Sequence, residues 1–586
     1  MQAKHNQTTN INALKELIPY FKPELLLVII SLFSMLLATF SSVLQPMILR
    51  TAIDSYILKG NYPGLLNLSY IFLALIASNY LFSFLGTYTS FLVSQKIILR
   101  IRMDLFNHIL ELAISFLNRT PVGVLITRVT NDTENLSDLI SGGGLQLIND
   151  FILLGLTTVF LIYINWQLTL VALVVAPFLI YIIIYFSRIL RVAYSKARDR
   201  LTQLNIFLQE NLSGISIIKI FGRKDLNFSK FDEIAKKYRD AVYNALHKDI
   251  LFNQIVNLSA YISNTLVIIF GGLMVINGKT SIGTLPAFLM YLQYFYSPLR
   301  RLGERFNILQ DALSSVDKIS SILKNREIIP EPEKPCEIEV KGEIEFKNVT
   351  FAYENEIVLN NVSFKIKPGE KIAIVGPTGA GKTTIMNLIL RLYDVNDGEI
   401  LIDSVNIKNF RSDFLRKNIA IVLQDVFIFK GTLMENITLG RTDIPKEKVY
   451  EAAKYLNAHD FIMSLPEGYD TELTPEGSNL SLGQKQLISF IRALVYDPKI
   501  LLLDEATSSV DTNTERLIQE GIEKIMKGRT SIAIAHRLST IIGCDRIFVL
   551  DRGKIIEEGN HEELINKRGF YYELYTTQFN EELINQ

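Results

Sequence analysis

The chain has 586 residues with 60 basic and 60 acidic side chains, so its formal net charge is zero. Of its residues 49% are hydrophobic and 20% are charged, which excludes a mainly disordered chain. The neutral balance argues against a protein that holds nucleic acid through bulk positive charge, and we expect no nucleic-acid partner. Two cysteines, Cys336 and Cys544, cannot build a disulfide framework. The positive mean hydropathy of +0.23 indicates membrane spans in part of the chain.

Long apolar segments fill the first half of the sequence. A helix needs roughly 20 apolar residues to cross a bilayer. Six segments qualify, and the last is weaker because it contains Pro286 and Pro298. Lysine and arginine gather between spans two and three and between spans four and five, so these segments and both termini are predicted to be cytoplasmic. The predicted spans are residues 25–49, 70–93, 145–164, 168–186, 255–276 and 282–299.

The second half has a different pattern. Clustered prolines between residues 328 and 335 predict a linker, since they interrupt helix and strand alike. From Gly342 onward no apolar run is long enough to span a bilayer, and short β-rich runs alternate with helical stretches, as in a parallel α/β sheet. We therefore predict a membrane domain over residues 1–325, a linker over 326–341 and an α/β domain over 342–586.

A phosphate-binding motif opens this second domain. A buried-strand signal at residues 372–375 runs into Gly-Pro-Thr-Gly-Ala-Gly-Lys-Thr-Thr at 376–384, and an apolar helix follows. This is the P-loop in its required strand–loop–helix context. Its glycines let backbone N–H groups turn toward phosphate oxygens, and the helix N-terminus adds positive potential. Lys382 is expected to reach the terminal phosphates, and the Thr383 hydroxyl to ligate Mg²⁺.

Two acids follow a second apolar strand further along. Asp504 suits a magnesium shell at the end of that strand, and Glu505 suits a general base that polarises water. Alone, two acids at this place also fit a helix N-cap, but the P-loop favours the catalytic interpretation. Upstream, Ser481 precedes a helical start, where its hydroxyl and the Gly483 N–H are suited to a phosphate.

Taken together, these motifs resemble the nucleotide-binding domain of an ATP-binding cassette (ABC) transporter. Nearly the whole chain resembles a bacterial half-transporter of the exporter type. The resemblance implies a membrane α-helical six-span domain fused to a cytoplasmic α/β P-loop ATPase domain, an ATP hydrolase that uses ATP and Mg²⁺. It also implies a multi-pass protein of the cell (cytoplasmic or inner) membrane. Residues 116–123 with 130–133, and residues 210–215, resemble the two coupling segments that dock on nucleotide-binding domains in this family.

The resemblance also assigns roles to single residues. Tyr353 would stack on adenine, residues 376–384 would hold the phosphates, and Ser481 with Gly483 would bind the γ-phosphate of the opposite subunit. The implied catalytic residues are Glu505, His536 and Gln424. The implied magnesium ligands are Thr383, Gln424 and Asp504. The implied ATP-binding residues are Tyr353, Gly376, Pro377, Thr378, Gly379, Ala380, Gly381, Lys382, Thr383, Thr384, Ser481, Gly483, Gln484 and Asp511.

The function implied by the resemblance is ATP-driven export or flipping of amphipathic or lipophilic compounds by alternating access. Ser481 and Lys382 would serve opposite ends of the ligand, so two chains would sandwich two ATP molecules. The partner is a second half-transporter chain, and homodimer and heterodimer both remain open. Leu482 stands where the commonest form of the signature has glycine. An ATP-gated channel or regulator on the same scaffold and a peptide exporter are the alternatives.

The substrate is less well indicated than the ATP site. Asp150 is the main ionisable candidate in the spans, and the scarcity of such groups disfavours a strongly ionic substrate in mid-membrane. Membrane lipid and a lipophilic small molecule or lipid substrate are the expected partners. An aromatic belt and helix–helix hydrogen bonds are competing interpretations of the other polar and aromatic residues. The candidate cavity residues are Tyr291, Tyr294, Phe295 and Tyr296 in span six and Asn253, Gln254, Asn257 and Asn264 in span five.

Overall fold

The chain forms two compact units, and the second unit includes a short segment from the first half of the sequence. The computed structural model describes residues 15, 17–504, 512–535 and 538–578. The first unit comprises Met1–Glu111 and Thr120–Asn325, and the second comprises Leu112–Arg119 and Arg326–Gln586. The backbone therefore passes from one unit to the other at three places. A short segment from the first half of the sequence, Leu112–Arg119, belongs to the second unit.

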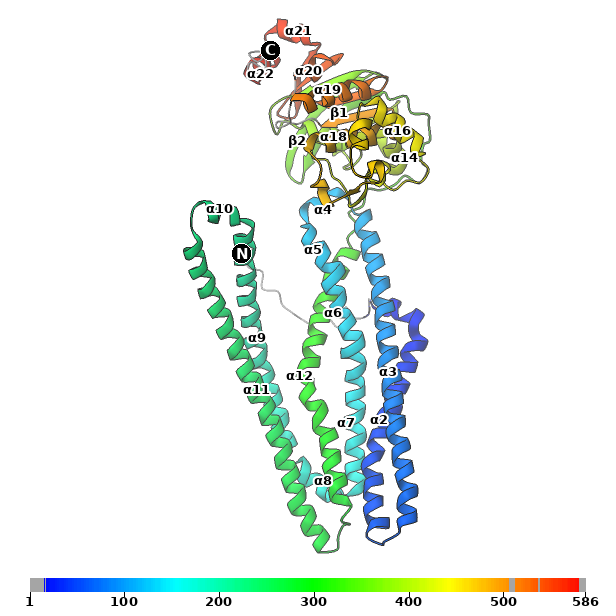
Figure 1. The fold of residues 1–586 in the computed structure, drawn as a ribbon, viewed down its shortest axis with the longest axis vertical. Helices are drawn as coiled ribbons and strands as arrows, with labels where there is room; N and C mark the ends of the chain where they lie inside the picture. Colours follow the sequence, from blue (N-terminus) through cyan, green and yellow to red (C-terminus); the bar gives the residue numbers. More distant parts are fainter. Residues whose placement is uncertain (1–14, 16, 505–511, 536–537, 579–586) are drawn as a thin grey trace. The chain divides into compact units, whose positions relative to one another are not determined.

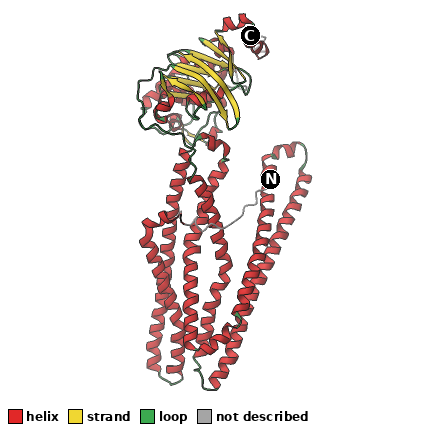
Figure 2. Ribbon diagram, turned by 180° about the vertical axis from the view of Figure 1, so that it is seen from behind, coloured by secondary structure: helices red, strands yellow, loops and turns green. Residues whose placement is uncertain are grey.

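Long helices build the first unit (Figures 1 and 2). Helix α3 has 50 residues, about 75 Å at 1.5 Å per residue, which is far longer than the roughly 30 Å of a hydrocarbon core. The charged residues that flank the apolar runs are consistent with helices that continue beyond the lipid. The helices are α1 (Ile18–Phe21), α2 (Leu25–Thr51), α3 (Tyr62–Glu111), α5 (Val122–Thr127), α6 (Thr133–Asp138), α7 (Leu145–Ile164), α8 (Trp166–Leu173), α9 (Ala176–Ser213), α10 (Ile215–Ile220), α11 (Lys224–Ile276) and α12 (Thr284–Leu323).

Within the described residues, five helical segments are long and apolar enough to cross a membrane: Ile18–Ile57, Tyr62–Glu111, Val122–Ile164, Trp166–Ser213 and Lys224–Ile276. They contain the first five predicted spans. The sixth predicted span lies in α12, which continues as one helix through Pro298. A proline removes one backbone hydrogen bond but does not end a membrane helix when its neighbours compensate.

The second unit is an α/β domain with two sheets. The six-stranded sheet has the order β12-β11-β3-β10-β9-β6, and its strands pair in parallel except for β12. The four-stranded sheet has the antiparallel order β2-β1-β4-β5, and β7 pairs with β8. The predicted parallel α/β sheet is therefore confirmed. The strands are β1 (Ile344–Tyr353), β2 (Glu356–Ile366), β3 (Lys371–Val375), β4 (Asp397–Ile402), β5 (Val405–Asn406), β6 (Ile419–Val422), β7 (Gly431–Thr432), β8 (Glu472–Leu473), β9 (Ile500–Asp504), β10 (Thr530–Ile534), β11 (Arg546–Asp551) and β12 (Lys554–Gly559).

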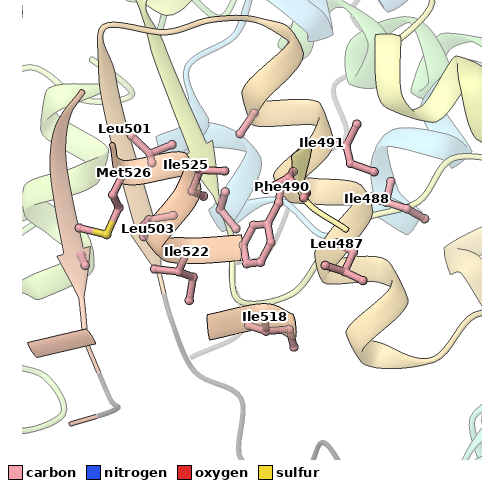
Figure 3. Close-up of a cluster of buried hydrophobic side chains, with 14 of the residues drawn as sticks. Leu487, Ile488, Phe490, Ile491, Leu501, Leu503, Ile518, Ile522, Ile525 and Met526 are labelled. Atoms are coloured by element: carbon pink, nitrogen blue, oxygen red, sulfur yellow. The ribbon is translucent and has the colours of Figure 1, made fainter. Parts of the chain in front are cut away.

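Apolar side chains cover both faces of the six-stranded sheet. Successive residues of a strand point to opposite faces. Leu501 and Leu503 of β9 accordingly join one buried cluster, and Ile500 and Leu502 join the other. Figure 3 shows the first cluster, where β9 lies against the apolar faces of α18 and α19. The helices of the unit are α4 (Ile114–Arg119), α13 (Lys382–Ile389), α14 (Ser412–Asn418), α15 (Leu433–Thr438), α16 (Lys446–Tyr455), α17 (His459–Met463), α18 (Leu482–Val495), α19 (Thr512–Met526), α20 (Leu538–Ile542), α21 (His561–Lys567) and α22 (Phe570–Gln578).

A buried arginine holds the start of the linker on this domain. Arg391 follows α13 and is only 1% exposed. Its guanidinium donates hydrogen bonds to the backbone oxygens of Pro330 at 2.6 Å and Phe410 at 3.0 Å, and to Asp394 at 3.3 Å. The backbone N–H of Cys336 donates to the Asn409 oxygen at 2.8 Å. The predicted linker therefore packs on the second unit and is not a free tether.

Candidate nucleotide site

The parallel strands bring predicted residues from distant parts of the chain to one edge of the sheet. Ile374 of β3 pairs with Ile534 of β10, and Ile534 pairs with Asp504 of β9. Strand β6 pairs with β9 in the same direction, and Gln424 follows its end by two residues. The P-loop, Asp504 and the segment that holds Gln424 therefore all lie at the carboxyl ends of neighbouring parallel strands. This edge is the usual place for a ligand in such sheets.

The P-loop conformation requires glycine at two positions. Gly376 has a φ of +153°, and a Cβ atom there would lie 2.1 Å from the backbone oxygen of Leu550. Gly381 has a φ of +104° directly before α13, and a Cβ atom there would lie 2.8 Å from the Leu359 side chain. Both φ values are ones that side-chain-bearing residues rarely adopt. The motif glycines thus permit a tight loop in front of a helix N-terminus.

Lys382 is the first residue of α13 and is largely buried, with 8% exposure. Its Nζ donates hydrogen bonds to the backbone oxygens of Gly376 at 2.8 Å and Pro377 at 3.0 Å. Burial lowers the pKa of this ammonium, and the carboxylate of Asp504 acts in the opposite direction. The amine is thus held against the backbone of the loop. The next residue, Thr383, is exposed, and its role as a magnesium ligand stays a prediction.

Tyr353, the predicted adenine-stacking residue, ends β1 within a cluster of aromatic rings. Its ring meets Tyr393 at 5.1 Å and Phe351 at 4.8 Å, both edge to face. The Tyr393 hydroxyl accepts a hydrogen bond from the side-chain amide of Asn118 on α4 at 3.0 Å. One ion pair, Arg119 to Glu354 at 3.6 Å, lies beside it. The first predicted coupling segment therefore contacts the residues around Tyr353.

This contact was not predicted residue by residue. Asn118 and Tyr393 are 275 positions apart, and no periodicity links them. The resemblance of residues 116–123 to a coupling segment indicated only that the segment docks on an ATPase domain. Tyr393 carries no motif of its own, and only its position shortly after the P-loop helix could have drawn attention to it.

The predicted signature residues begin α18. The Ser481 hydroxyl accepts a hydrogen bond from the Gln484 backbone N–H at 3.3 Å, and the Gln484 side chain accepts one from the Ser481 N–H at 2.9 Å. This reciprocal pair is a capping box. Gly483 is buried and Ser481 is exposed, so the serine is accessible at a helix N-terminus. Leu482 is half exposed, at 41%, so its side chain fits at this position.

Three predicted site residues, Glu505, Asp511 and His536, lie outside the described residues. In the sequence Glu505 follows the last residue of β9, and His536 comes two residues after the end of β10. The roles of these three residues stay predictions. The same holds for the contacts that Gly379, Ala380, Thr378 and Thr384 would make with a nucleotide.

The candidate substrate residues of the membrane unit separate into two groups. Asn257, Asn264, Tyr294 and Tyr296 line one cavity of about 400 Å³ with Arg300. The others have different surroundings. The buried Tyr291 hydroxyl donates to the Val43 oxygen, the Asn253 amide donates to the Asp249 oxygen, the Phe295 ring packs edge to face on Tyr296, and Gln254 is exposed.

In a comparison with known proteins, two family models match separate parts of the sequence. The model of the ABC transporter transmembrane region matches residues 28–299, and the ABC transporter model matches residues 359–508. An uncharacterised ABC transporter ATP-binding protein of Bacillus subtilis is 38% identical over 94% of this chain and 92% of its own length. An ATP-dependent lipid A-core flippase of Syntrophus aciditrophicus is 37% identical over 84% and 82%. A putative multidrug export ATP-binding/permease protein of B. subtilis is 36% identical over 83% and 84%.

Proposed function

Since the chain belongs to the ABC transporter family, we propose that it exports or flips amphipathic or lipophilic compounds across the cytoplasmic membrane by alternating access in a dimer. Membership makes it a membrane protein with a cytoplasmic ATPase domain that couples ATP hydrolysis to transport. The observation that carries the proposal is the P-loop with its buried Lys382 at the edge of the sheet where β9 ends at Asp504, in one chain with long apolar helices.

In the proposed mechanism the site would work as follows. Thr383, Asp504 and Gln424 supply hydroxyl, carboxylate and amide oxygens, the ligand types that Mg²⁺ prefers, so these residues would hold the ion. The ion would neutralise charge on the terminal phosphates. Glu505 would take the proton of the attacking water, and His536 would contact the γ-phosphate. Tyr353 would stack on the adenine ring.

A second copy or a related half-transporter is the proposed partner. Helix α10 lies in the predicted cytoplasmic segment between spans four and five, where lipid cannot cover it. Yet Ile217, Ile220 and Phe221 in and after α10 are 63%, 78% and 72% exposed. Exposed apolar groups of this size usually mark an interaction surface. The ATPase surface carries a complementary exposed pair, Phe427 and Phe429, with ring centroids 4.9 Å apart.

The substrate class follows from the relatives and the spans. Relatives of similar length are described as a lipid A-core flippase and as a putative multidrug exporter. By these names the first acts on lipid A-core and the second on drugs, and for the present chain we propose amphipathic or lipophilic compounds, a class wide enough to include both. A peptide exporter and an ATP-gated channel remain the alternatives. The base Glu505 in the sequence favours a pump, because a gate depends on ATP binding more than on turnover.

The deciding experiment is the ATPase activity of the purified chain alone in lipid vesicles, parent against Glu505→Gln, combined with movement of a labelled lipid or drug. Loss of a general base lowers turnover by roughly 10²–10⁴. We expect ATPase and transport to fall together, while ATP binding persists. Parental turnover in the variant would disprove the role of Glu505. ATPase activity without movement of any lipid, drug or peptide would disprove the pump.

A further inference from the structure

A polar cavity of about 270 Å³ lies between four helices of the membrane unit, α2, α3, α7 and α12. The ATP site does not use it, and it is separate from the cavity lined by Tyr294. Small hydroxyl side chains line one part of it and charged side chains line another. Its polar lining includes Ser83 and Thr87 of α3, Asn149 and Asp150 of α7, and Arg301 and Arg305 of α12.

Asp150 is the acid in this cavity and is only 4% exposed. One carboxylate oxygen, Oδ1, accepts a hydrogen bond from Arg301 at 2.8 Å. The other oxygen, Oδ2, is buried and has no hydrogen-bond partner among the described residues. A buried carboxylate oxygen without a donor is costly, and ionisable groups inside spans usually serve a ligand. A ligand in the cavity that donates a hydrogen bond to Oδ2 would therefore remove this cost.

Arg305, which also lines this cavity, has a hydrogen-bond donor that lacks an acceptor among the described residues. Two of its nitrogens donate hydrogen bonds, to the Gly142 backbone oxygen and to the Gln146 side chain. Its Nε is buried and has no acceptor among the described residues. The described lining thus offers one free acceptor on Asp150 and one free donor on Arg305. With one carboxylate and two guanidinium groups, the described charged side chains sum to one positive charge.

Asp150 and Arg301 lie on the cytoplasmic side of the membrane centre. Asp150 lies about 21 Å along α7 from its outer end at Ile164, at 1.5 Å per residue. Arg301 lies about 26 Å along α12 from its outer end at Thr284. In a hydrocarbon core of roughly 30 Å both residues are in the cytoplasmic half. The scarcity of charged residues in mid-membrane is compatible with this placement.

We propose that this cavity binds the headgroup of a monoanionic amphiphile that also carries a hydroxyl group. The anionic group would accept from Arg305 Nε and offset the excess positive charge, and the hydroxyl would donate to Asp150 Oδ2. A cationic headgroup would face two guanidinium groups, and an anion without a hydroxyl would leave Oδ2 unpaired. The assignment rests on the proposed export function and narrows its substrate class.

The test uses the full chain in neutral detergent, without ATP, and measures dissociation constants for three single-chain amphiphiles. Lysophosphatidylglycerol has an anion and hydroxyls, hexadecyl sulfate has an anion alone, and hexadecyltrimethylammonium has a quaternary ammonium alone. We expect the parent to bind lysophosphatidylglycerol tightest. Arg305→Gln should weaken binding of both anions by about tenfold or more, because a charge-assisted hydrogen bond is lost. Asp150→Asn should reduce the preference for the hydroxylated anion over hexadecyl sulfate.

The matched control is Asp54→Asn, which removes a carboxylate from the opposite end of the span, where Asp54 pairs with Arg50 at 3.6 Å. It should leave all three constants unchanged. The ranking of the amphiphiles on the parent requires no variant, so a misfolded variant leaves the test intact. Equal binding of the three amphiphiles, or parental binding by Arg305→Gln, would overturn the proposal. Selective binding without Glu505-dependent transport would support this site and refute the proposed export.

Discussion

Replacing the buried Arg391 with methionine should destabilise the ATPase unit strongly. The change keeps much of the length of the side chain but deprives Pro330, Phe410 and Asp394 of their donor. Removing one partner of a buried charged network costs about 3–5 kcal/mol. At about 2–4 °C per kcal/mol for a domain of this size, the unfolding midpoint should fall by about 6–20 °C.

The assay is thermal unfolding of the ATPase unit in the full chain. The release of a bound fluorescent ATP analogue reports the unfolding. Arg411→Met is the matched control, because Arg411 pairs with Asp413 at 2.9 Å with both side chains 56% exposed. An exposed pair contributes about 0–1 kcal/mol, so the midpoint of this control should hardly change. If the midpoints of the two variants lay within about 2 °C of each other, the hydrogen bonds of Arg391 would not be what stabilises the unit.

Three further outcomes are expected. Lys382→Ala should weaken ATP binding by about 10–150-fold, as for a charged hydrogen-bond donor worth about 1.5–3 kcal/mol; a titration with a fluorescent ATP analogue that gives parental affinity would contradict this. Asn118→Ala and Tyr393→Phe break the same 3.0 Å hydrogen bond, so in a double-mutant cycle of thermal stability their effects should overlap by about 0.5–1.5 kcal/mol; strict additivity would count against the contact. Burial lowers the pKa of His561 below its ordinary 6.5, so the unfolded chain binds the proton more readily, and stability should fall as the pH drops below about 6.5. His561→Gln should flatten that dependence in melts recorded from about pH 5 to about pH 7.5, and an unchanged slope would refute it.

Local patterns were sufficient to predict the features that depend on contiguous residues. The P-loop was found because strand, glycines, lysine and helix follow one another within residues 372–389, and the structure has β3 and α13 there. The apolar spans were found because lipid imposes a length on each. The helical start after Ser481 was likewise predicted, and α18 begins at Leu482.

Contacts between distant residues could not be predicted in this way. Nothing in the sequence near Arg391 indicates that its side chain is buried, because its acceptors include a backbone oxygen 61 positions earlier. The free Oδ2 of Asp150 depends on how four helices pack. The prolines of α12 weakened the prediction of a sixth span, since sequence rules treat proline as a helix breaker, whereas α12 runs as one helix through Pro298.

The backbone passes between the two units at three places, next to Leu112, Arg119 and Arg326, so no single cut of the chain separates them. An ATPase domain excised at Arg326 would lack α4 and with it the partner of Tyr393. The smallest piece that keeps this hydrogen bond therefore has to include residues from both halves of the sequence.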